Sequence, residues 1–140
     1  MTPLNITLSE TPSEADRDAI IAPLLAYNIA RAGDPRKRPV ALLLTDDKGA
    51  KLGGLWGRIG YDWLFVELLS VPEQHRGSGL GAALMRRAEQ VARGEQCVGI
   101  WLDTYDFQAR GFYEKLGFEV FGAIDDYPPG HQRFFLRKHL

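Results

Sequence analysis

The feature that most constrains this chain is a glycine-rich stretch, RGSGLG at 76–81, which runs directly into a segment of helical character. Over residues 81–94, apolar side chains recur at helical spacing and charged ones fall mostly on the other face, until Gly94 ends the pattern. Backbone amides at a helix N-terminus have no partners within the helix and carry the positive end of the helix dipole. The sequence therefore predicts a turn that can bind a phosphate group.

Two well-known phosphate-binding motifs compete for this stretch. Gly77 to Ala82 satisfy G-x-G-x-x-[GA], and Asp103 follows at a strand end about 20 residues later, as in dinucleotide-binding folds. In those folds the strand runs directly into the first glycine, whereas here 72–76 intervene, and too little chain follows Asp103 for a doubly wound sheet. A nicotinamide or flavin site is therefore disfavoured. A Walker A loop is excluded, because no Gly-Lys-Ser/Thr follows.

Composition and charge limit the class of protein. The chain has 140 residues, of which 45% are hydrophobic and 25% charged, so we expect one globular domain over 1–140. A net charge of −1 gives no overall attraction to nucleic acid or to an anionic membrane. No apolar run approaches the roughly 18 residues of a membrane span, and no secretory signal is visible, so we expect a cytoplasmic protein without membrane or nucleic-acid partners.

Cysteine and metal chemistry have little support in the sequence. Cys97 is the only cysteine and has apolar neighbours, which favours a small core residue over a nucleophile. No His, Cys and Asp residues have metal-ligand spacing, so no metal is expected.

The order of secondary structure follows from periodicity and from glycine and proline positions. We expect helices over 13–33, with a Ser13 cap and a kink or division at Pro23, over 81–94 and over 108–118. We expect strands over 3–8, three in an antiparallel meander over 40–71, one over 98–105, and a final pair joined through DYPPG. The predicted fold class is α/β (α+β), with a mixed, mostly antiparallel sheet of about seven strands flanked by helices.

Two motifs at a defined spacing carry a resemblance to a known family. R-x-x-G-x-G at 76–81 follows Val71-Pro72, and FYEKLGF at 112–118 follows Ala109. Together they resemble the GCN5-related N-acetyltransferase (GNAT) family. The resemblance implies a GNAT-like fold in which acetyl-CoA lies in a V between the strands at 63–71 and 98–105.

The resemblance also implies the coenzyme contacts. The pyrophosphate is expected on the turn amides, and the pantetheine arm is expected to extend the strand at 63–71, with a bulge at Ser70. The cofactor-binding residues are then Leu69, Ser70, Val71, Arg76, Gly77, Ser78, Gly79, Leu80, Gly81 and Ala82.

Catalytic roles are assigned by the same resemblance. Tyr113 matches the general acid that protonates the leaving thiolate, although helical spacing alone favours a core aromatic. Glu67, in an otherwise apolar strand, matches a carboxylate that accepts the proton of the amine, directly or through water. The alternative is that Glu67 faces solvent or pairs with an arginine.

The acceptor side is predicted from charge. Asp103, Asp106 and His131 are the candidate substrate-binding residues, and an acidic pocket would favour a cationic amine. Ordinary solvated charges are an equal alternative. Asp106 stands where the family often has an asparagine that contacts the pantetheine, so that contact needs other donors here.

The predicted function is acetyl transfer from acetyl-CoA to a primary amine, favouring a small cationic molecule, by direct attack in a ternary complex. Transfer of another acyl group from its CoA ester and a non-catalytic CoA-binding module remain alternatives. A homodimer, which is common in the resembled family, is compatible with the sequence.

Overall fold

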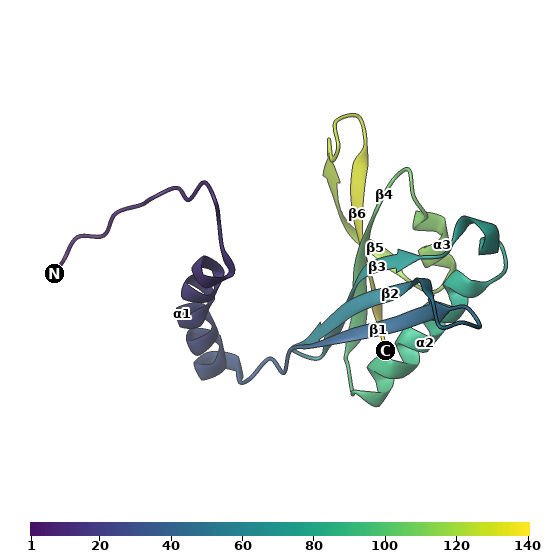
Figure 1. The fold of residues 1–140 in the computed structure, drawn as a ribbon, viewed down its shortest axis with the longest axis horizontal. Coiled ribbons are helices and arrows are strands. Elements are labelled where there is room, and N and C mark those ends of the chain that lie inside the picture. Colours follow the sequence, from purple (N-terminus) through teal and green to yellow (C-terminus); the bar gives the residue numbers. More distant parts are fainter. The chain divides into compact units, whose positions relative to one another are not determined.

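The computed structural model describes residues 1–140, which divide into two units, 1–35 and 36–140 (Figure 1). The first unit contains α1, Glu14–Ala32. Ser13 begins this helix with a capping box, because its hydroxyl accepts from the Asp16 amide while the Asp16 carboxylate accepts from the Ser13 amide. The predicted cap is confirmed. Pro23 lies within one uninterrupted helix and does not divide it.

The predicted strand at 3–8 is wrong. Residues 1–13 form no helix or strand, and the side chains of Leu4, Ile6 and Leu8 are exposed. Alternating β-branched residues favour extended backbone, but alternation alone does not make a strand, which also needs hydrogen bonds to a neighbouring strand. The sheet therefore has six strands and not about seven.

The second unit is built on that six-stranded sheet, in the order β1-β2-β3-β4-β6-β5. Only β3 and β4 are parallel, so the predicted mixed, mostly antiparallel sheet is confirmed. The parallel pair joins the predicted meander to the C-terminal part of the sheet. The strands are β1 Arg38–Thr45, β2 Lys51–Gly60, β3 Trp63–Ser70, β4 Gly99–Tyr105, β5 Glu119–Asp125 and β6 Gln132–His139.

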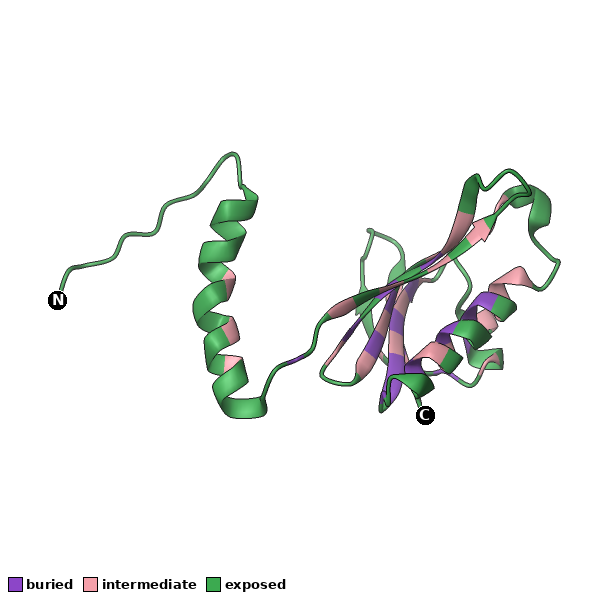
Figure 2. Ribbon diagram, turned by 60° about the horizontal axis from the view of Figure 1, so that its bottom comes forward, coloured by how far each residue is buried: buried purple, intermediate pink, exposed green.

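Two helices pack on the sheet and form the core with it. These are α2, Leu80–Gly94, and α3, Arg110–Lys115. Ala88 of α2 is fully buried against strand residues such as Leu64 and Ile100, and its small side chain allows the helix to approach the sheet closely. Burying each large aliphatic side chain contributes about 1.5–3 kcal/mol. Figure 2 shows the buried residues on the strands beneath these helices. Each helix is either too short or too polar for a membrane-spanning segment.

A β-bulge in β3 changes the direction of its side chains. Trp56 pairs with Leu68 but Gly57 pairs with Val66, so Glu67 is the extra residue. The predicted bulge at Ser70 is wrong. Gly57 explains the position: a Cβ there would lie 2.5 Å from the Phe65 carbonyl oxygen, so glycine alone permits the close approach of β2 to β3.

Candidate active site

A cavity of about 800 Å³ opens where β3 and β4 diverge. These parallel strands pair only as far as Val66 and Leu102, although they continue to Ser70 and Tyr105. Beyond this last pair, the edge of β3 that faces β4 and the edge of β4 that faces β3 no longer hydrogen-bond to each other. The cavity therefore lies between the carboxyl ends of two parallel strands, where ligands commonly bind in α/β sheets.

Most of the predicted site residues line this cavity. Four do not: Ser70, Ser78, Asp106 and His131. The turn, the end of β3 and α3 thus meet around one space. The lining includes Glu67, Leu69, Val71, Arg76, Gly77, Gly79, Leu80, Gly81, Ala82, Asp103 and Tyr113.

The glycine turn presents unshielded backbone at the start of α2. Gly77 and Gly79 have φ of 78° and 85°, which side chains disfavour, and a Cβ at either would meet no protein atom within 4 Å. Gly79 is the N-cap of α2, and no side chain caps the helix. The first residues of α2, 80–82, line the cavity, and no side chain caps their amides, as an anion site requires.

Side chains on the other side of the turn hold its shape. The Ser78 hydroxyl donates to the His75 carbonyl, which explains why Ser78 faces away from the cavity. Arg76 donates from Nε to the Val71 carbonyl at 3.1 Å. This hydrogen bond uses one of the two lone pairs of the Val71 carbonyl oxygen and joins the turn to the residue that follows β3.

Tyr113 lies between the core and the cavity. Its residue is only 9% exposed and packs edge-on against Phe112 and Phe118, with ring centroids 5.0 and 6.1 Å away. No protein group hydrogen-bonds its hydroxyl. Burial, with a smaller effect from the negative charge of Asp103, raises the pKa of Tyr113 above its ordinary value. The phenol therefore keeps its proton, as a general acid must. Tyr113 is thus a buried aromatic residue of the core and also a possible proton donor.

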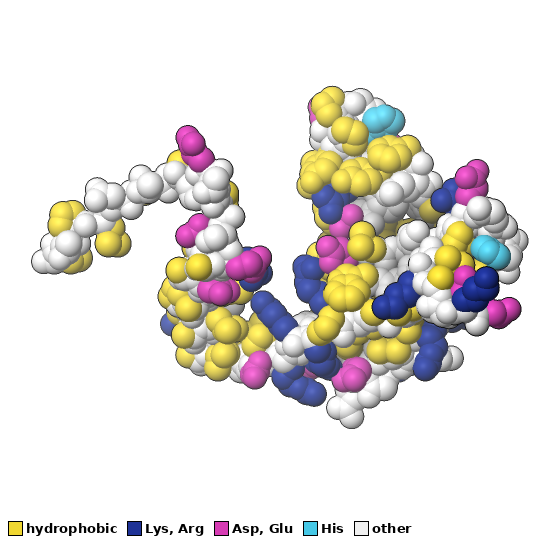
Figure 3. All heavy atoms as spheres, in the orientation of Figure 1, with side chains coloured by type: hydrophobic (Ala, Val, Ile, Leu, Met, Phe, Trp, Pro, Cys, Tyr) yellow, Lys and Arg dark blue, Asp and Glu magenta, His cyan; other side chains and the backbone are white.

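Asp103 on β4 is paired with a residue that sequence analysis missed. Arg133 on β6 donates from Nη2 to Asp103 Oδ2 at 2.8 Å, and both side chains are mostly buried. Arg133 also lines the cavity. Figure 3 shows acidic and basic side chains next to one another on the sheet in this region. This pairing neutralises much of the negative charge that Asp103 would bring to the cavity.

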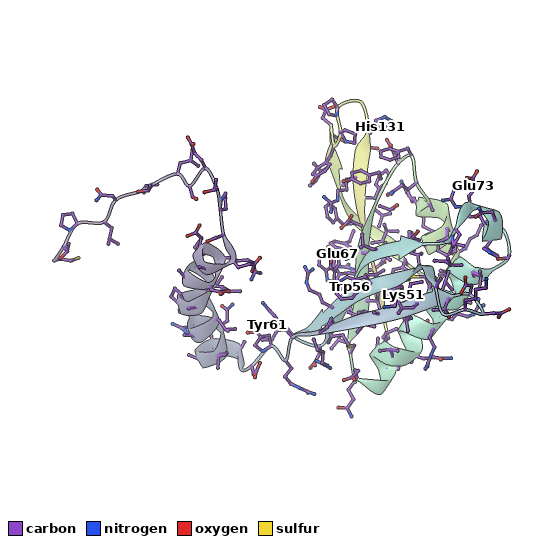
Figure 4. All side chains as sticks on the ribbon, in the orientation of Figure 1. Lys51, Trp56, Tyr61, Glu67, Glu73 and His131 are labelled. Atoms are coloured by element: carbon purple, nitrogen blue, oxygen red, sulfur yellow. The ribbon has the colours of Figure 1, made fainter.

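Glu67 lines the cavity from the bulge in β3 (Figure 4). Its carboxylate lies 3.7 Å from Arg58 Nη1, and the two side chains are 46% and 57% exposed, so this surface ion pair is weak. Glu67 is thus both in the cavity and beside an arginine. A role as proton acceptor and an ion pair with Arg58 do not exclude one another, because the exposed arginine side chain can adopt another rotamer.

Comparisons with known proteins show the family to which the chain belongs. The sequence profile of the Acetyltransferase (GNAT) family matches residues 5–118. The chain belongs to this family. An acetyltransferase of Agrobacterium fabrum is 36% identical over 137 residues, which cover 98% of this chain and all of the relative. The blasticidin-S acetyltransferase of Streptomyces morookaense is 43% identical over 107 residues, covering 74% and 79%.

Solved structures show the same GNAT fold. A crystal structure of an acetyltransferase from Agrobacterium tumefaciens superposes with a TM-score of 0.92 at 36% identity, covering 98% of this chain and 100% of the other. Together, the family match and the relatives identify this GNAT protein as an N-acetyltransferase.

Asp106 and His131 lie together in this GNAT enzyme, but outside the cavity. His131 Nδ1 is 2.8 Å from Asp106 Oδ1, and the Gln132 amide donates to Oδ2 at 2.9 Å. Slight burial opposes these hydrogen bonds, but they prevail and lower the pKa of Asp106. Both carboxylate oxygens therefore tie the β4–α3 loop to the β5–β6 hairpin, whose tip carries His131 (Figure 4).

Several lining residues of the GNAT cavity were not predicted. The main ones are Tyr105, Gln108 and Arg133. Gln108 Oε1 accepts from the Tyr105 amide at 2.8 Å and from the Thr104 hydroxyl at 3.1 Å, which closes the turn after β4. Alternation along 98–105 could have placed Tyr105 beside Asp103. Arg133 needed the β4–β6 register, which the sequence does not contain.

Cys97 does not line the GNAT cavity. It belongs to the buried core, and burial raises the pKa of its thiol. The thiolate that a nucleophile requires is therefore disfavoured. No three His, Cys, Asp or Glu side chains are grouped so as to hold a metal ion.

Proposed function

We propose that this N-acetyltransferase binds acetyl-CoA in the cavity between β3 and β4 and transfers its acetyl group to the primary amine of a small cationic molecule. One observation carries the proposal: a single cavity joins the uncapped amides of the glycine turn to Tyr113 and Glu67. A coenzyme anchored by its phosphates at the turn can thereby reach the two candidate catalytic residues.

The residues of the turn and of β3 suit this coenzyme. Gly77 and Gly79 leave space where a Cβ would otherwise stand, so phosphate oxygens can approach the backbone. The part of β3 after Val66 has no β4 partner, so an extended arm can hydrogen-bond its free edge. Arg76 lines the same mouth and adds positive charge near the phosphates.

Two side chains supply the proton transfers. When bound, acetyl-CoA supplies an activated acetyl group as a thioester. Glu67 accepts a proton from the acceptor ammonium, directly or through water, because an amine attacks only when neutral. Tyr113, whose pKa burial raises above its ordinary value, holds its proton at neutral pH and donates it to the sulfur as the C–S bond breaks. The new amide nitrogen then loses its second proton to solvent, and Tyr113 takes up a proton from solvent, which returns it to its starting state. A strand amide at Leu69 or Val71 polarises the carbonyl.

The acceptor class follows from charge and from one relative. The carboxylate of Glu67 is about half exposed and lines the cavity, whereas the charge of Asp103 is largely neutralised by Arg133. The negative charge of Glu67 favours a cationic amine over a neutral or anionic one. The name of the blasticidin-S acetyltransferase, 43% identical over 107 residues, supports a small molecule as acceptor.

Thiol release from acetyl-CoA, followed with a colorimetric thiol reagent, tests this proposal. We expect release only when an amine is added, starting with blasticidin S and simple diamines, and a mass increase of one acetyl group on the amine. Propionyl-CoA, run in parallel, tests the acyl preference. Acetyl-CoA binding without amine-dependent release would indicate a coenzyme-binding module, and absence of binding would overturn the assignment of the cavity.

A further inference from the structure

Aromatic side chains gather beside the cavity, where β4 ends under the β5–β6 hairpin. They line a second hollow of about 590 Å³, formed by Tyr105, Phe107, Asp126, Tyr127 and Pro128. Figure 3 shows hydrophobic side chains over this hairpin. The Tyr105 and Phe107 rings are nearly parallel, with centroids 5.1 Å apart and planes at 8°. Tyr127 faces Tyr105 at 5.8 Å, tilted by 44°. We call this hollow the aromatic slot.

The aromatic slot shares a wall with the cavity. Tyr105 lines both spaces. Arg133, which lines the cavity, lies over the ring of Tyr127 at 4.8 Å and over that of Tyr105 at 5.6 Å. A molecule that extends from the cavity past Arg133 therefore enters the slot. The Nε of Arg133 is buried and has no hydrogen-bond partner in the protein. Since buried donors are nearly always hydrogen-bonded, this N–H group can donate to a ligand at the shared wall.

Hydrogen bonds hold the rings of the slot in place. The Asp106 amide donates to the Gln132 carbonyl at 2.9 Å, and the Asp106 carboxylate accepts from His131 and from the Gln132 amide. The His131 ring then packs edge-on against Phe107 at 5.1 Å. These contacts join the loop that carries Phe107 to the hairpin that carries Tyr127, so the slot is preorganised for a ligand.

The rings of the slot are more exposed than aromatic residues of the core. Phe107 is 58% exposed and Tyr127 is 41% exposed, so neither ring gains the full benefit of burial in the folded chain. Ligand pockets are lined mainly by hydrophobic and aromatic side chains, and aromatic side chains stack on flat rings. Aromatic pairs stack with centroids 4.5–7 Å apart, a range that the slot rings already occupy among themselves.

We propose that the aromatic slot binds a flat, unsaturated ring of the acceptor while its amine points into the cavity toward Glu67. This inference rests on the proposed function and narrows its substrate class to amines that carry such a ring. The ring stacks on Tyr127 and Tyr105, and Asp126, which also lines the slot, favours a ring of partial positive charge. Arg133 separates the two parts of the acceptor and can donate to a polar group between them.

Two pairs of amines test the slot, each differing only in whether the ring is flat. The first pair is phenethylamine and cyclohexylethylamine. The second pair is phenylbutylamine and cyclohexylbutylamine, whose longer chain puts a greater distance between the ring and the amine. With saturating acetyl-CoA, we expect kcat/KM to favour the flat ring by about three- to tenfold in at least one pair. In Tyr127→Leu and in Phe107→Leu this preference should fall to about one, through a higher KM for the flat amine, while KM for acetyl-CoA stays unchanged.

Phe121→Leu is the matched control. Phe121 is an exposed aromatic residue of β5, 48% exposed, which lines neither the slot nor the cavity. The preference for the flat ring should survive in this variant. Thermal unfolding of all three variants shows whether they fold. Phe107 and Tyr127 lie on different segments, so if one of these two variants fails to fold, the other still tests the slot.

A binding readout separates failure of the slot from failure of the proposed function. Saturation-transfer NMR should show contact between the protein and the ring protons of phenethylamine or phenylbutylamine, lost in Tyr127→Leu and kept in Phe121→Leu. Without any amine-dependent thiol release, the proposed function fails while this signal still supports the slot. Acetylation of flat and puckered amines at equal rates, unaffected by Tyr127→Leu, would overturn the slot and leave the proposed function intact.

Discussion

Arg133 on β6 reaches diagonally to Asp103 on the neighbouring strand β4. Its direct partner in the β4–β6 register is Tyr105, yet its guanidinium ion-pairs with the Asp103 carboxylate at 2.8 Å. Asp103 in turn contributes to the raised pKa of Tyr113. An ion pair at the cavity wall is thereby linked electrostatically to the candidate general acid on α3.

Replacing Asp103 with asparagine should lower the pKa of Tyr113, because a negative charge nearby disfavours the phenolate and its removal relieves that effect. If protonated Tyr113 is the acid, the basic limb of the pH profile of kcat/KM should move to lower pH. Ultraviolet difference spectra of the phenolate give an independent reading. Asp62→Asn removes the same charge outside the cavity and should leave the limb in place, and a fixed limb in both variants would contradict the link.

Replacing Tyr113 with phenylalanine removes only the hydroxyl and keeps the packing against Phe112 and Phe118. Loss of a general acid typically lowers kcat by about 10²–10⁴-fold. The dissociation constant of acetyl-CoA, measured by calorimetry, should stay close to that of the wild type. A variant that binds acetyl-CoA normally and turns over at the wild-type rate would remove Tyr113 from the mechanism.

Replacing Glu67 with glutamine keeps the size of the side chain and removes the proton acceptor. We expect kcat/KM to fall by about 10²-fold or more near neutral pH, and to recover partly at high pH, where a larger share of the amine is already neutral. Glu119→Gln is the control, since Glu119 also forms an exposed ion pair, with Arg137, but lies outside the cavity. Equal losses in both variants would assign the effect to surface charge.

Local patterns explain which parts of the fold were predictable. The Ser13 cap and the apolar spacing of 81–94 report helices directly, because caps and helical faces are local properties. The segment at 3–8 has the alternation of a strand, but alternation does not supply a hydrogen-bonding partner. The bulge depends on the approach of Gly57 to Phe65 across two strands, which one strand's sequence does not express.

The candidate site divides in the same way. The glycine turn and Tyr113 belong to contiguous motifs, so the sequence indicates them and the cavity contains them. Arg133 enters the cavity only through the pairing of β4 with β6, and its contact with Asp103 is set by register. The sequence marks Asp106 as a departure from the family pattern. Its hydrogen bonds from the β4–α3 loop to the hairpin depend on long-range contacts, which the sequence does not show.

Replacing Cys97 with alanine should leave kcat and KM unchanged. The thiol is buried in the core, its pKa is raised by burial, and it does not line the cavity. A modest loss of unfolding free energy, about 1 kcal/mol, is expected from the lost packing. Iodoacetamide should also leave the native enzyme active, whereas strong inactivation, absent in the alanine variant, would support a covalent acetyl-cysteine route.

Replacing Gly79 with alanine should weaken acetyl-CoA binding by about tenfold, measured by titration calorimetry. Gly79 has φ of 85° at the N-cap of α2, a conformation that costs a residue with a side chain about 1–2 kcal/mol. Alanine therefore favours a relaxed turn in the free protein, and acetyl-CoA binding must restore the original conformation at that cost. The added methyl group would also occupy open space beside the amides. Gly94→Ala, at the other end of the same helix, adds the same methyl group to helical backbone and should bind acetyl-CoA normally. If both variants bind like the wild type, the phosphates do not rest on this turn.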